Sequence, residues 1–162
     1  TDINGVPAHA VSMVVDGGDA EEIARIIAIK KSPGAPTFGT TTVIVKDAYD
    51  TDKPIHFFRP TKVPIYAAIK IKVLPGYTSD IGEDIKKAVS DYINTLYIGD
   101  TVYFSRLYVP ATLGNAASGK TYDLMTVSIG KDAVTMSEAN IPILFNESAT
   151  CSPENIAIIT VA

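Results

Sequence analysis

Cysteine, histidine and tryptophan are almost absent from this chain of 162 residues. Cys151 is the only cysteine, His9 and His56 are the only histidines, and there is no tryptophan. A lone cysteine cannot form an intrachain disulfide, so stability must come from packing, and the redox compartment stays open. No H-E-x-x-H and no G-x-S-x-G pattern occurs, so the signatures of two common hydrolase classes are missing.

Long apolar runs and an excess of positive charge are also lacking. The longest apolar stretches, such as residues 65–69 and 156–161, are far shorter than the ~20 residues that cross a bilayer as a helix. The formal net charge is −4 and the isoelectric point is near 5.1, whereas nucleic acids and anionic membranes select basic faces. We therefore expect no membrane insertion and no general binding of nucleic acid.

The remaining composition is that of a soluble globular protein. Hydrophobic residues make up 46% of the chain and charged residues 20%. A chain of this length buries about two-thirds of its unfolded surface, which suffices for one good core or two small ones.

Residues 11–31 predict a strand followed by a helix. The apolar run at residues 11–15 is typical of a strand, and a Gly-Gly pair ends it. Asp19 and Glu22 have the D-x-x-E spacing of a capping box, which predicts a helix that begins near Asp19. A phosphate cradle is the alternative for such a turn, but carboxylates at the helix start would repel an anion, so we favour the capping turn.

The packing face of this helix follows from its isoleucines. Ile23, Ile26 and Ile27 recur at three- and four-residue spacing, and we expect them to lie against a sheet. The sequence Ser-Pro-Gly at residues 32–34 predicts the end of the helix.

This region carries a family resemblance. Residues 14–43 have the sequence V-V-D-G-G-D-A-E-E-I-A-R-I-I-A-I-K-K-S-P-G-A-P-T-F-G-T-T-T-V, with G-V-P-A-H at residues 5–9 and P-I-H-F-F-R-P at residues 54–60. The pattern resembles the baseplate J-like family, structural proteins of contractile phage tails and of related prophage elements. The resemblance extends from residue 5 to about residue 64. It is looser from residue 66 to 130, where the order of elements is similar to the C-terminal part of the family.

The resemblance implies a structural role in the wedge of a tail baseplate. It implies self-association and contacts with other baseplate and tail proteins, either in the virion or in the bacterial cytoplasm during assembly. The family supplies no catalytic residues and no cofactor to carry over. It also implies that an N-terminal portion of the parent protein lies outside this sequence.

A hairpin is predicted after the first helix, with strands at residues 40–46 and 55–59. The turn between them holds Asp47, Asp50 and Asp52, which are weak candidates for binding calcium through their carboxylates. Their spacing is not that of an EF-hand loop, so we favour a solvated hairpin tip.

The second hairpin strand places successive side chains on opposite faces. Ile55 and Phe57 are expected on one face, and His56 and Phe58 on the other. Because Phe57 and Phe58 cannot both face the same core, we expect one of them to be an interface residue, covered either by a partner or by the second unit of the chain.

Pro60 and Pro64 predict the boundary between two units, residues 1–62 and residues 63–162. The predicted fold class is α+β, with two consecutive small sheet-plus-helix units and mixed or antiparallel sheets. In the second unit, residues 65–74, 122–129 and 156–161 predict strands. The last of these is uncharged, and we expect it either to be buried in this domain or to be completed by a neighbouring chain.

The second unit also contains the most strongly amphipathic helix. Asp80 and Glu83 repeat the D-x-x-E spacing, which predicts a helix capped by Asp80, and Ser90 is expected on its outward face. The predicted apolar stripe consists of Ile81, Ile85, Ala88, Val89, Tyr92, Ile93 and Leu96.

No enzyme signature emerges from these residues, and we expect a non-enzymatic protein without cofactors. Cys151 has no basic neighbour to activate it, which favours an inert thiol. Two alternatives remain open. One is a non-catalytic module that binds calcium at residues 47–52 or a glycan on exposed aromatic side chains. The other is an enzyme whose site converges on His56, Arg59 or Asp50.

Overall fold

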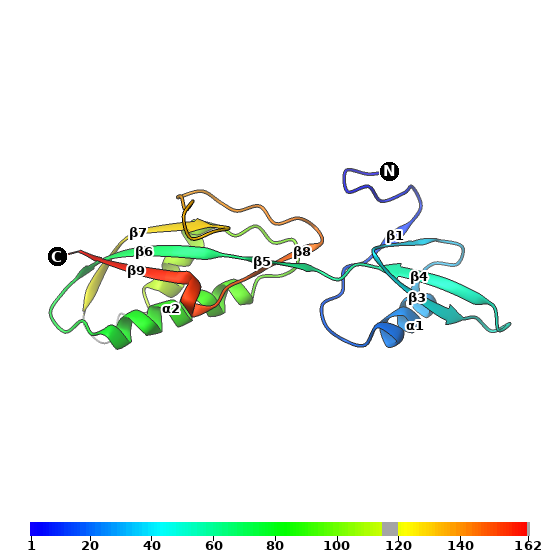
Figure 1. The fold of residues 1–162 in the computed structure, drawn as a ribbon, viewed down its shortest axis with the longest axis horizontal. Coiled ribbons are helices and arrows are strands. Elements are labelled where there is room, and N and C mark those ends of the chain that lie inside the picture. The colour runs from blue at the N-terminus through cyan, green and yellow to red at the C-terminus, as the bar shows by residue number, and fades with distance from the viewer. Residues whose placement is uncertain (115–119, 162) are drawn as a thin grey trace. The chain divides into compact units, whose positions relative to one another are not determined.

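The computed structural model describes residues 1–114 and 120–161, and the chain divides into two compact units, Thr1–Thr61 and Lys62–Ala162 (Figure 1). This division lies one residue from the boundary that Pro60 and Pro64 predict. Both units combine helices with strands in small separate sheets, so the predicted α+β class is confirmed.

The first unit consists of one helix and two strand pairs. Its elements are β1 (Val11–Ser12), α1 (Ala20–Lys30), β2 (Thr37–Phe38), β3 (Thr41–Lys46) and β4 (Asp52–Phe57). β1 and β2 pair in parallel, whereas β3 and β4 form the predicted antiparallel hairpin. The strand predicted at residues 11–15 is shorter than expected, because the chain leaves β2 after Ser12 and makes only a single bridge from Val14 to Phe58.

Helix α1 begins as predicted. The Asp19 carboxylate accepts a hydrogen bond from the backbone N–H of Glu22 at 2.9 Å, which satisfies one of the unpaired donors of the first turn. The packing face differs from the prediction, because Ala24 and Ile27 are buried with Ile55 and Phe57, whereas Ile26 is 52% exposed. Ile26 lies about 200° around the helix from Ala24, which places it on the far side of the core.

The second unit is built around a three-stranded sheet. Its elements, with β5 starting at the boundary, are β5 (Thr61–Pro64), β6 (Tyr66–Val73), α2 (Ser79–Asn94), η1 (Phe104–Leu107), α3 (Tyr108–Ala111), β7 (Tyr122–Gly130), β8 (Glu147–Thr150), η2 (Pro153–Asn155) and β9 (Ile156–Val161). β6 is central, antiparallel to β7 and parallel to β9, and β5 pairs with β8. None of the helices within the described residues has the length and apolar character that crossing a membrane requires.

Helix α2 lies along one face of this sheet (Figure 1) and completes the core of the second unit. Ile85, Val89 and Ile93 of its predicted stripe are fully buried, together with Ile69 and Ile71 of β6. Lys70 and Lys72 of β6 alternate with these isoleucines and are at least partly exposed. The strand therefore has one dry face and one wet face, as its alternation predicts.

Two expectations for α2 are wrong. The helix begins at Ser79 with Thr78 as its N-cap residue and no side-chain capping bond, so Asp80 lies in the first turn and does not cap the helix. The Glu83 carboxylate pairs with Lys86 at 2.8 Å instead. Ser90 is buried, because the packing face is broader than the apolar stripe, and its hydroxyl donates to the backbone carbonyl of Lys87 at 3.0 Å.

Candidate functional site

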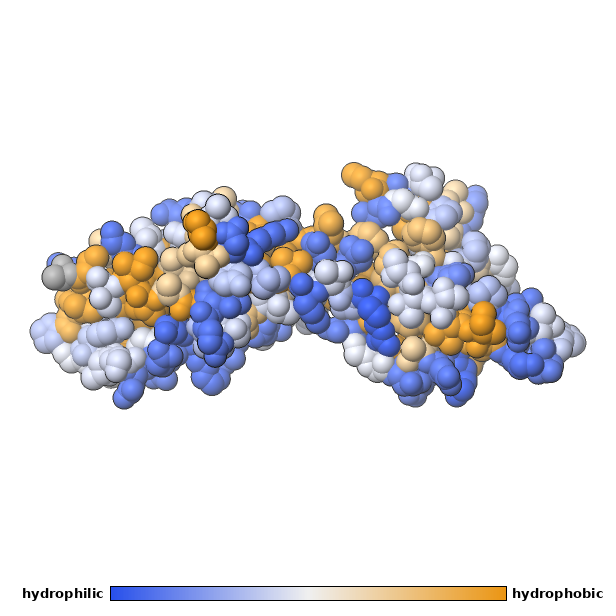
Figure 2. Space-filling model, in the orientation of Figure 1, coloured by the Kyte–Doolittle hydropathy of each residue, from blue (hydrophilic) through white to orange (hydrophobic). Residues whose placement is uncertain are grey.

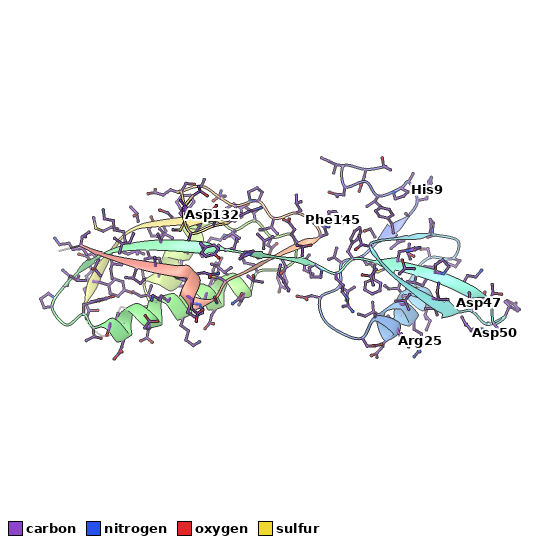
Figure 3. The ribbon with its side chains drawn as sticks, viewed as in Figure 1. His9, Arg25, Asp47, Asp50, Asp132 and Phe145 are labelled. Atoms are coloured by element: carbon purple, nitrogen blue, oxygen red, sulfur yellow. The ribbon has the colours of Figure 1, made fainter. Side chains whose placement is uncertain are left out.

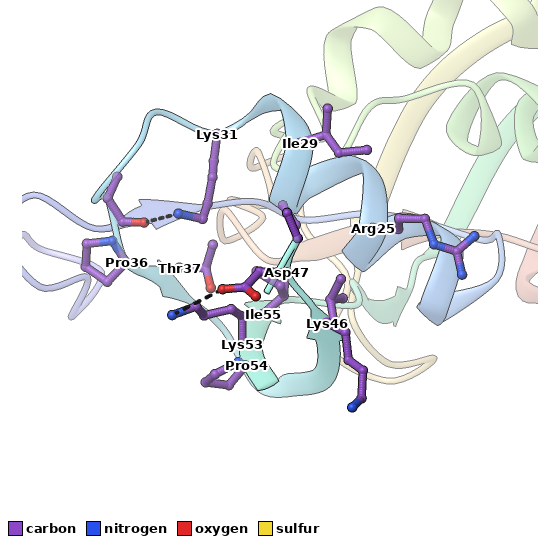
Figure 4. A pocket seen from close by; sticks show the side chains of 14 residues that line it. Arg25, Ile29, Lys31, Pro36, Thr37, Lys46, Asp47, Lys53, Pro54 and Ile55 are labelled. Atoms are coloured by element: carbon purple, nitrogen blue, oxygen red, sulfur yellow. Dashed lines mark hydrogen bonds and ion pairs between the residues drawn. The ribbon is translucent and has the colours of Figure 1, made fainter. Parts of the chain in front are cut away.

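A cavity of about 460 Å³ lies between α1 and the β3–β4 hairpin of the first unit (Figure 4). Its apolar lining includes Val45, Pro54 and the buried Ile55. Four cationic side chains also line it, against the single carboxylate of Asp47; they are Arg25, Lys31, Lys46 and Lys53. The cavity therefore combines an apolar interior with an excess of positive charge.

The cations of this cavity differ in how they are engaged. The Lys31 ammonium donates to the carbonyl oxygen of Ala35 at 2.8 Å, and the Lys53 ammonium lies 3.7 Å from the Asp47 carboxylate (Figure 4). Lys46 forms an exposed ion pair with Asp50 at 2.9 Å. Arg25 has no hydrogen-bond or ion-pair partner within the described residues, so its guanidinium is available to a ligand.

A second hollow, of about 340 Å³, adjoins the first. It is lined by Glu21 and Arg25 of α1 and by residues 43–46 of β3. Arg25, Val45 and Lys46 line both hollows. We refer to the two hollows together as the α1–β3 groove. The lining contains no histidine, cysteine or serine, and the groove offers charge and apolar contact.

The acidic turn uses its carboxylates within the hairpin. Asp47 accepts hydrogen bonds from the backbone N–H groups of Tyr49 and Thr51, at 2.9 and 3.0 Å. These bonds, Thr51 first and Tyr49 second, hold the pKa of the Asp47 carboxyl below its ordinary value. Asp50 adopts the left-handed region at φ 58° and pairs with Lys46.

The weak metal candidates are therefore close in sequence without forming a metal site. Figure 3 shows Asp47 and Asp50 at the tip of the hairpin, with His9 well away from them. Asp52 is exposed at the start of β4. Across residues 1–114 and 120–161, no three His, Cys, Asp or Glu side chains are grouped so that they could hold a metal ion.

Phe57 and Phe58 are both buried within the first unit. Phe57 belongs to the core under α1, whereas Phe58 lies beyond the end of β4 and packs edge-on against Phe38, with 5.8 Å between ring centroids. The backbone of Phe58 bonds to Met13 and Val15. The expectation that a partner or the second unit covers one phenylalanine is therefore wrong, because the β1–β2 segment of the first unit covers the second face.

The residues considered for an enzyme serve structural roles. The Arg59 guanidinium donates to the backbone carbonyls of Val15, Gly17 and Gly18 and lies over the Phe57 ring at 5.2 Å. The backbone N–H of His56 donates to the Thr37 hydroxyl at 2.8 Å. Neither Arg59 nor His56 lines the α1–β3 groove.

Cys151 is buried in the second unit. Burial, with a smaller contribution from the Glu154 carboxylate, raises the pKa of its thiol from 9.0 to about 11. A thiol that stays protonated at neutral pH is a poor nucleophile, which agrees with the inert role expected from its neighbours.

Sequence reasoning missed the cations of the α1–β3 groove. Arg25 belongs to a helix, Lys46 to a strand and Lys53 to the next strand, and only the packing of α1 on the hairpin brings them together. The one signal in the sequence is the alternation along β3, which predicts that Lys46 points away from the core.

No protein-family model matches this chain, and no curated protein matches it either.

Proposed function

We propose that the chain is a structural component of a contractile tail baseplate, of a phage or a prophage, and that it acts through protein–protein assembly without catalysis. The turn–helix–turn pattern of residues 14–43, which resembles the baseplate J-like family, supports this assignment. Its partners are other baseplate and tail proteins and further copies of the same chain. Its location is the virion, or the bacterial cytoplasm during assembly.

The observation that carries the proposal is the number of open sheet edges. Among the named strands, only β6 lies between two others. β3 pairs with β4 alone, and β9 pairs with β6 alone. Edge strands of monomeric proteins are commonly protected by charged residues, prolines or bulges, and open edges favour the addition of strands from other chains.

β9 has the features of an edge that is used for assembly. Its sequence, I-A-I-I-T-V, contains no charged residue and no proline, and Ile159 is 48% exposed. The side of β9 away from β6 has no strand partner among the described residues. This arrangement supports the second of the two expectations for the strand, that a neighbouring chain completes it.

The use of the polar groups supports a role without catalysis. Asp19 caps α1, Asp47 closes the hairpin turn, and Arg59 holds the turn at residues 15–18. Polar side chains that are engaged in shaping the backbone are not available for turnover, whereas assembly needs edges and apolar patches more than a pocket.

Immunogold electron microscopy tests the proposal. Antibodies raised against the purified chain are applied to contractile tails from the phage or bacterium that encodes it. We expect gold particles at the baseplate end of the tail, and we expect prior adsorption of the antibody with the chain to remove them. Detection of the chain in the lysate by immunoblot, with none in purified tails, would overturn the proposal.

The β9 edge is tested by sedimentation velocity as a function of concentration. We expect the chain to self-associate, and we expect Ile159→Lys to weaken that association because a charge is placed on the edge strand. Val134→Lys is the matched control, since Val134 is 90% exposed and lies outside β9. A monomer at all concentrations, or equal effects of the two substitutions, would refute self-association through this edge.

A further inference from the structure

We propose that the α1–β3 groove binds an extended segment of a partner protein, rich in acidic and apolar residues, which adds as a strand to the outer edge of β3. That the partner is a baseplate protein rests on the proposed function. The binding chemistry rests on the contacts of the first unit alone.

Some of the hydrogen-bonding groups of β3 are not used by β4. Thr42 lies opposite His56, and Ile44 lies opposite Pro54. The N–H of His56 donates to Thr37, and proline has no N–H, so neither residue can exchange two bonds with its opposite residue on β3. Since opposite residues of an antiparallel pair exchange both bonds or neither, Thr42 and Ile44 direct their N–H and C=O groups away from β4.

Because the direction of these groups alternates along a strand, the N–H and C=O groups of Lys46 also point away from β4. Three backbone N–H groups and three carbonyls of β3 therefore face outward along one edge. The opposite edge of the hairpin is covered, because the Thr37 hydroxyl of β2 accepts the N–H of His56 at 2.8 Å. A partner strand can therefore add to the hairpin at β3 and not at β4.

The groove follows the edge of β3. Residues 43–46 all line the smaller hollow. Successive residues of a strand point to opposite faces, so a hollow that is lined by four in succession lies along the edge of the strand. This hollow continues into the larger cavity across Arg25, Val45 and Lys46. An extended peptide fits such a continuous track better than a compact ligand does.

Large apolar side chains are exposed along the groove. Ile29 of α1 lines the larger cavity and is 73% exposed, and Ile44 of β3 lines the smaller hollow and is 57% exposed. Figure 2 shows apolar residues gathered on this face of the first unit, over α1 and β3. Exposed apolar side chains along a groove mark interaction sites, and alternate side chains of an added strand would cover them.

Charge defines the chemistry of the partner. Four cations and one carboxylate line the larger cavity, and Arg25 has no partner within the described residues. Carboxylates on the incoming segment complement these cations. Glu21 and Asp47 lie on the same groove, so separated carboxylates among apolar residues fit it better than the continuous negative charge of a nucleic acid.

The first test uses fluorescence anisotropy with a labelled peptide, acetyl-Glu-Val-Asp-Val-Glu-Val-Asp-amide, at low salt. We expect saturable binding, and we expect Arg25→Gln to weaken it about fivefold, the equivalent of one partly exposed charge pair. Lys30→Gln is the matched control, because it removes one cation from the same helix outside the groove, and it should change binding less than about twofold.

The second test addresses strand addition. Ile44→Pro removes an outward N–H and leaves the β3–β4 hydrogen bonds in place, and we expect it to abolish peptide binding. Ile44→Thr keeps the N–H and should retain binding. Amide hydrogen exchange should slow at Thr42, Ile44 and Lys46 when the peptide is bound to the native chain.

The inference is overturned if the peptide does not bind, if Ile44→Pro binds it as tightly as the native chain does, or if the bound peptide protects amides of β9 and not those of β3. It is also overturned if a peptide with Gln and Asn in place of the acids binds equally tightly, or if single-stranded DNA binds the same groove more tightly. Gold-labelled baseplates without peptide binding would refute the inference and leave the proposed function standing. Peptide binding to the chain, with no gold label on the tails, would refute the proposed function and leave the binding chemistry of the groove standing.

Discussion

The side-chain amide of Asn94 is hydrogen-bonded twice to the backbone of Cys151. Its Nδ2 donates to the Cys151 carbonyl at 2.7 Å, and its Oδ1 accepts from the Cys151 N–H at 3.0 Å. Asn94 is the last residue of α2, and Cys151 follows β8 directly. One side chain therefore joins the end of a helix to the segment that leads into β9, across 57 positions of sequence.

Substitution of Asn94 should destabilise the second unit. We expect Asn94→Ala to lower its free energy of unfolding by about 1–3 kcal/mol, because two backbone groups lose their partner. Asn94→Asp should cost more at neutral pH, since a carboxylate cannot donate to the Cys151 carbonyl and would lie against it. Hydrogen exchange of the β6 amides in the core of this unit measures the change. Asn140→Ala, at an exposed asparagine, is the control, and an equal loss there would contradict the prediction.

The Cys151 thiol should be protected from alkylation in the folded chain. With its pKa raised from 9.0 to about 11 by burial, the thiolate fraction at pH 8 falls about 100-fold. We expect iodoacetamide to label the native chain at least that much more slowly than the chain in urea. Equal rates of labelling would show that the thiol is not buried.

The same thiol predicts a dependence of stability on alkaline pH. The unfolded thiol ionises near 9.0 and the folded thiol near 11, so the folded state holds the proton more tightly. The contribution to stability is complete below pH 9 and is lost as the pH rises toward 11. Cys151→Ala should lack this part of the pH dependence, and identical alkaline profiles of the two proteins would contradict the assignment.

Local signals in the sequence predicted local structure well. Asp19 caps its helix, the β3–β4 hairpin forms where alternation and the acidic turn place it, and the chain divides beside Pro60. The start of α2 was misplaced because Thr78 and Asp80 are both residues that cap helices, and the sequence alone does not rank two such residues so close together.

Features that depend on packing were not predictable in the same way. Ile26 shares a three-residue spacing with Ile23, which packs partly buried against the core, but which flank of a helix meets the sheet depends on the tertiary fold. The parallel pairing of β9 with β6 joins strands that are far apart in sequence. The α1–β3 groove likewise draws Arg25 and Lys53 from separate elements, and no sequence spacing connects them.

The hairpin turn should respond to acid through Asp47. Backbone hydrogen bonds from Thr51 and Tyr49 lower the pKa of this carboxyl below 3.8, so the folded state favours its ionised form. The resulting contribution to stability is present above the pKa of the unfolded chain, near 3.8, and is lost as the pH falls through the folded value. Carboxyl carbon NMR should give a midpoint below 3.8 in the folded chain and a higher one in urea.

Calcium provides an independent measurement on the same turn. Because Asp47 bonds to the backbone and Asp50 pairs with Lys46, we expect calcium at about 1 mM, the upper end for weak protein sites, to shift neither the NMR signals of this turn nor the melting temperature. A saturable shift confined to residues 47–52 would revive the calcium-binding alternative.

Gly39 should be intolerant of any side chain. A Cβ at this position would lie 2.2 Å from the carbonyl carbon and 2.4 Å from the Cα of Phe57, and both are backbone atoms. We expect Gly39→Ala to lower the free energy of unfolding of the first unit by about 2 kcal/mol or more, because β4 must move away from the core under α1. Circular dichroism and hydrogen exchange at β4 measure the loss.

Gly82→Ala distinguishes a backbone clash from a movable one. A Cβ at Gly82 would lie 2.7 Å from the Tyr77 hydroxyl, which is the end of a side chain that can rotate away. Alanine also favours a helix interior over glycine by about 1 kcal/mol, so the net change should stay within about 1 kcal/mol of zero. If Gly82→Ala proves as damaging as Gly39→Ala, then Tyr77 is held rigidly by its contact with Tyr122, and the core of the second unit is less adaptable than its geometry indicates.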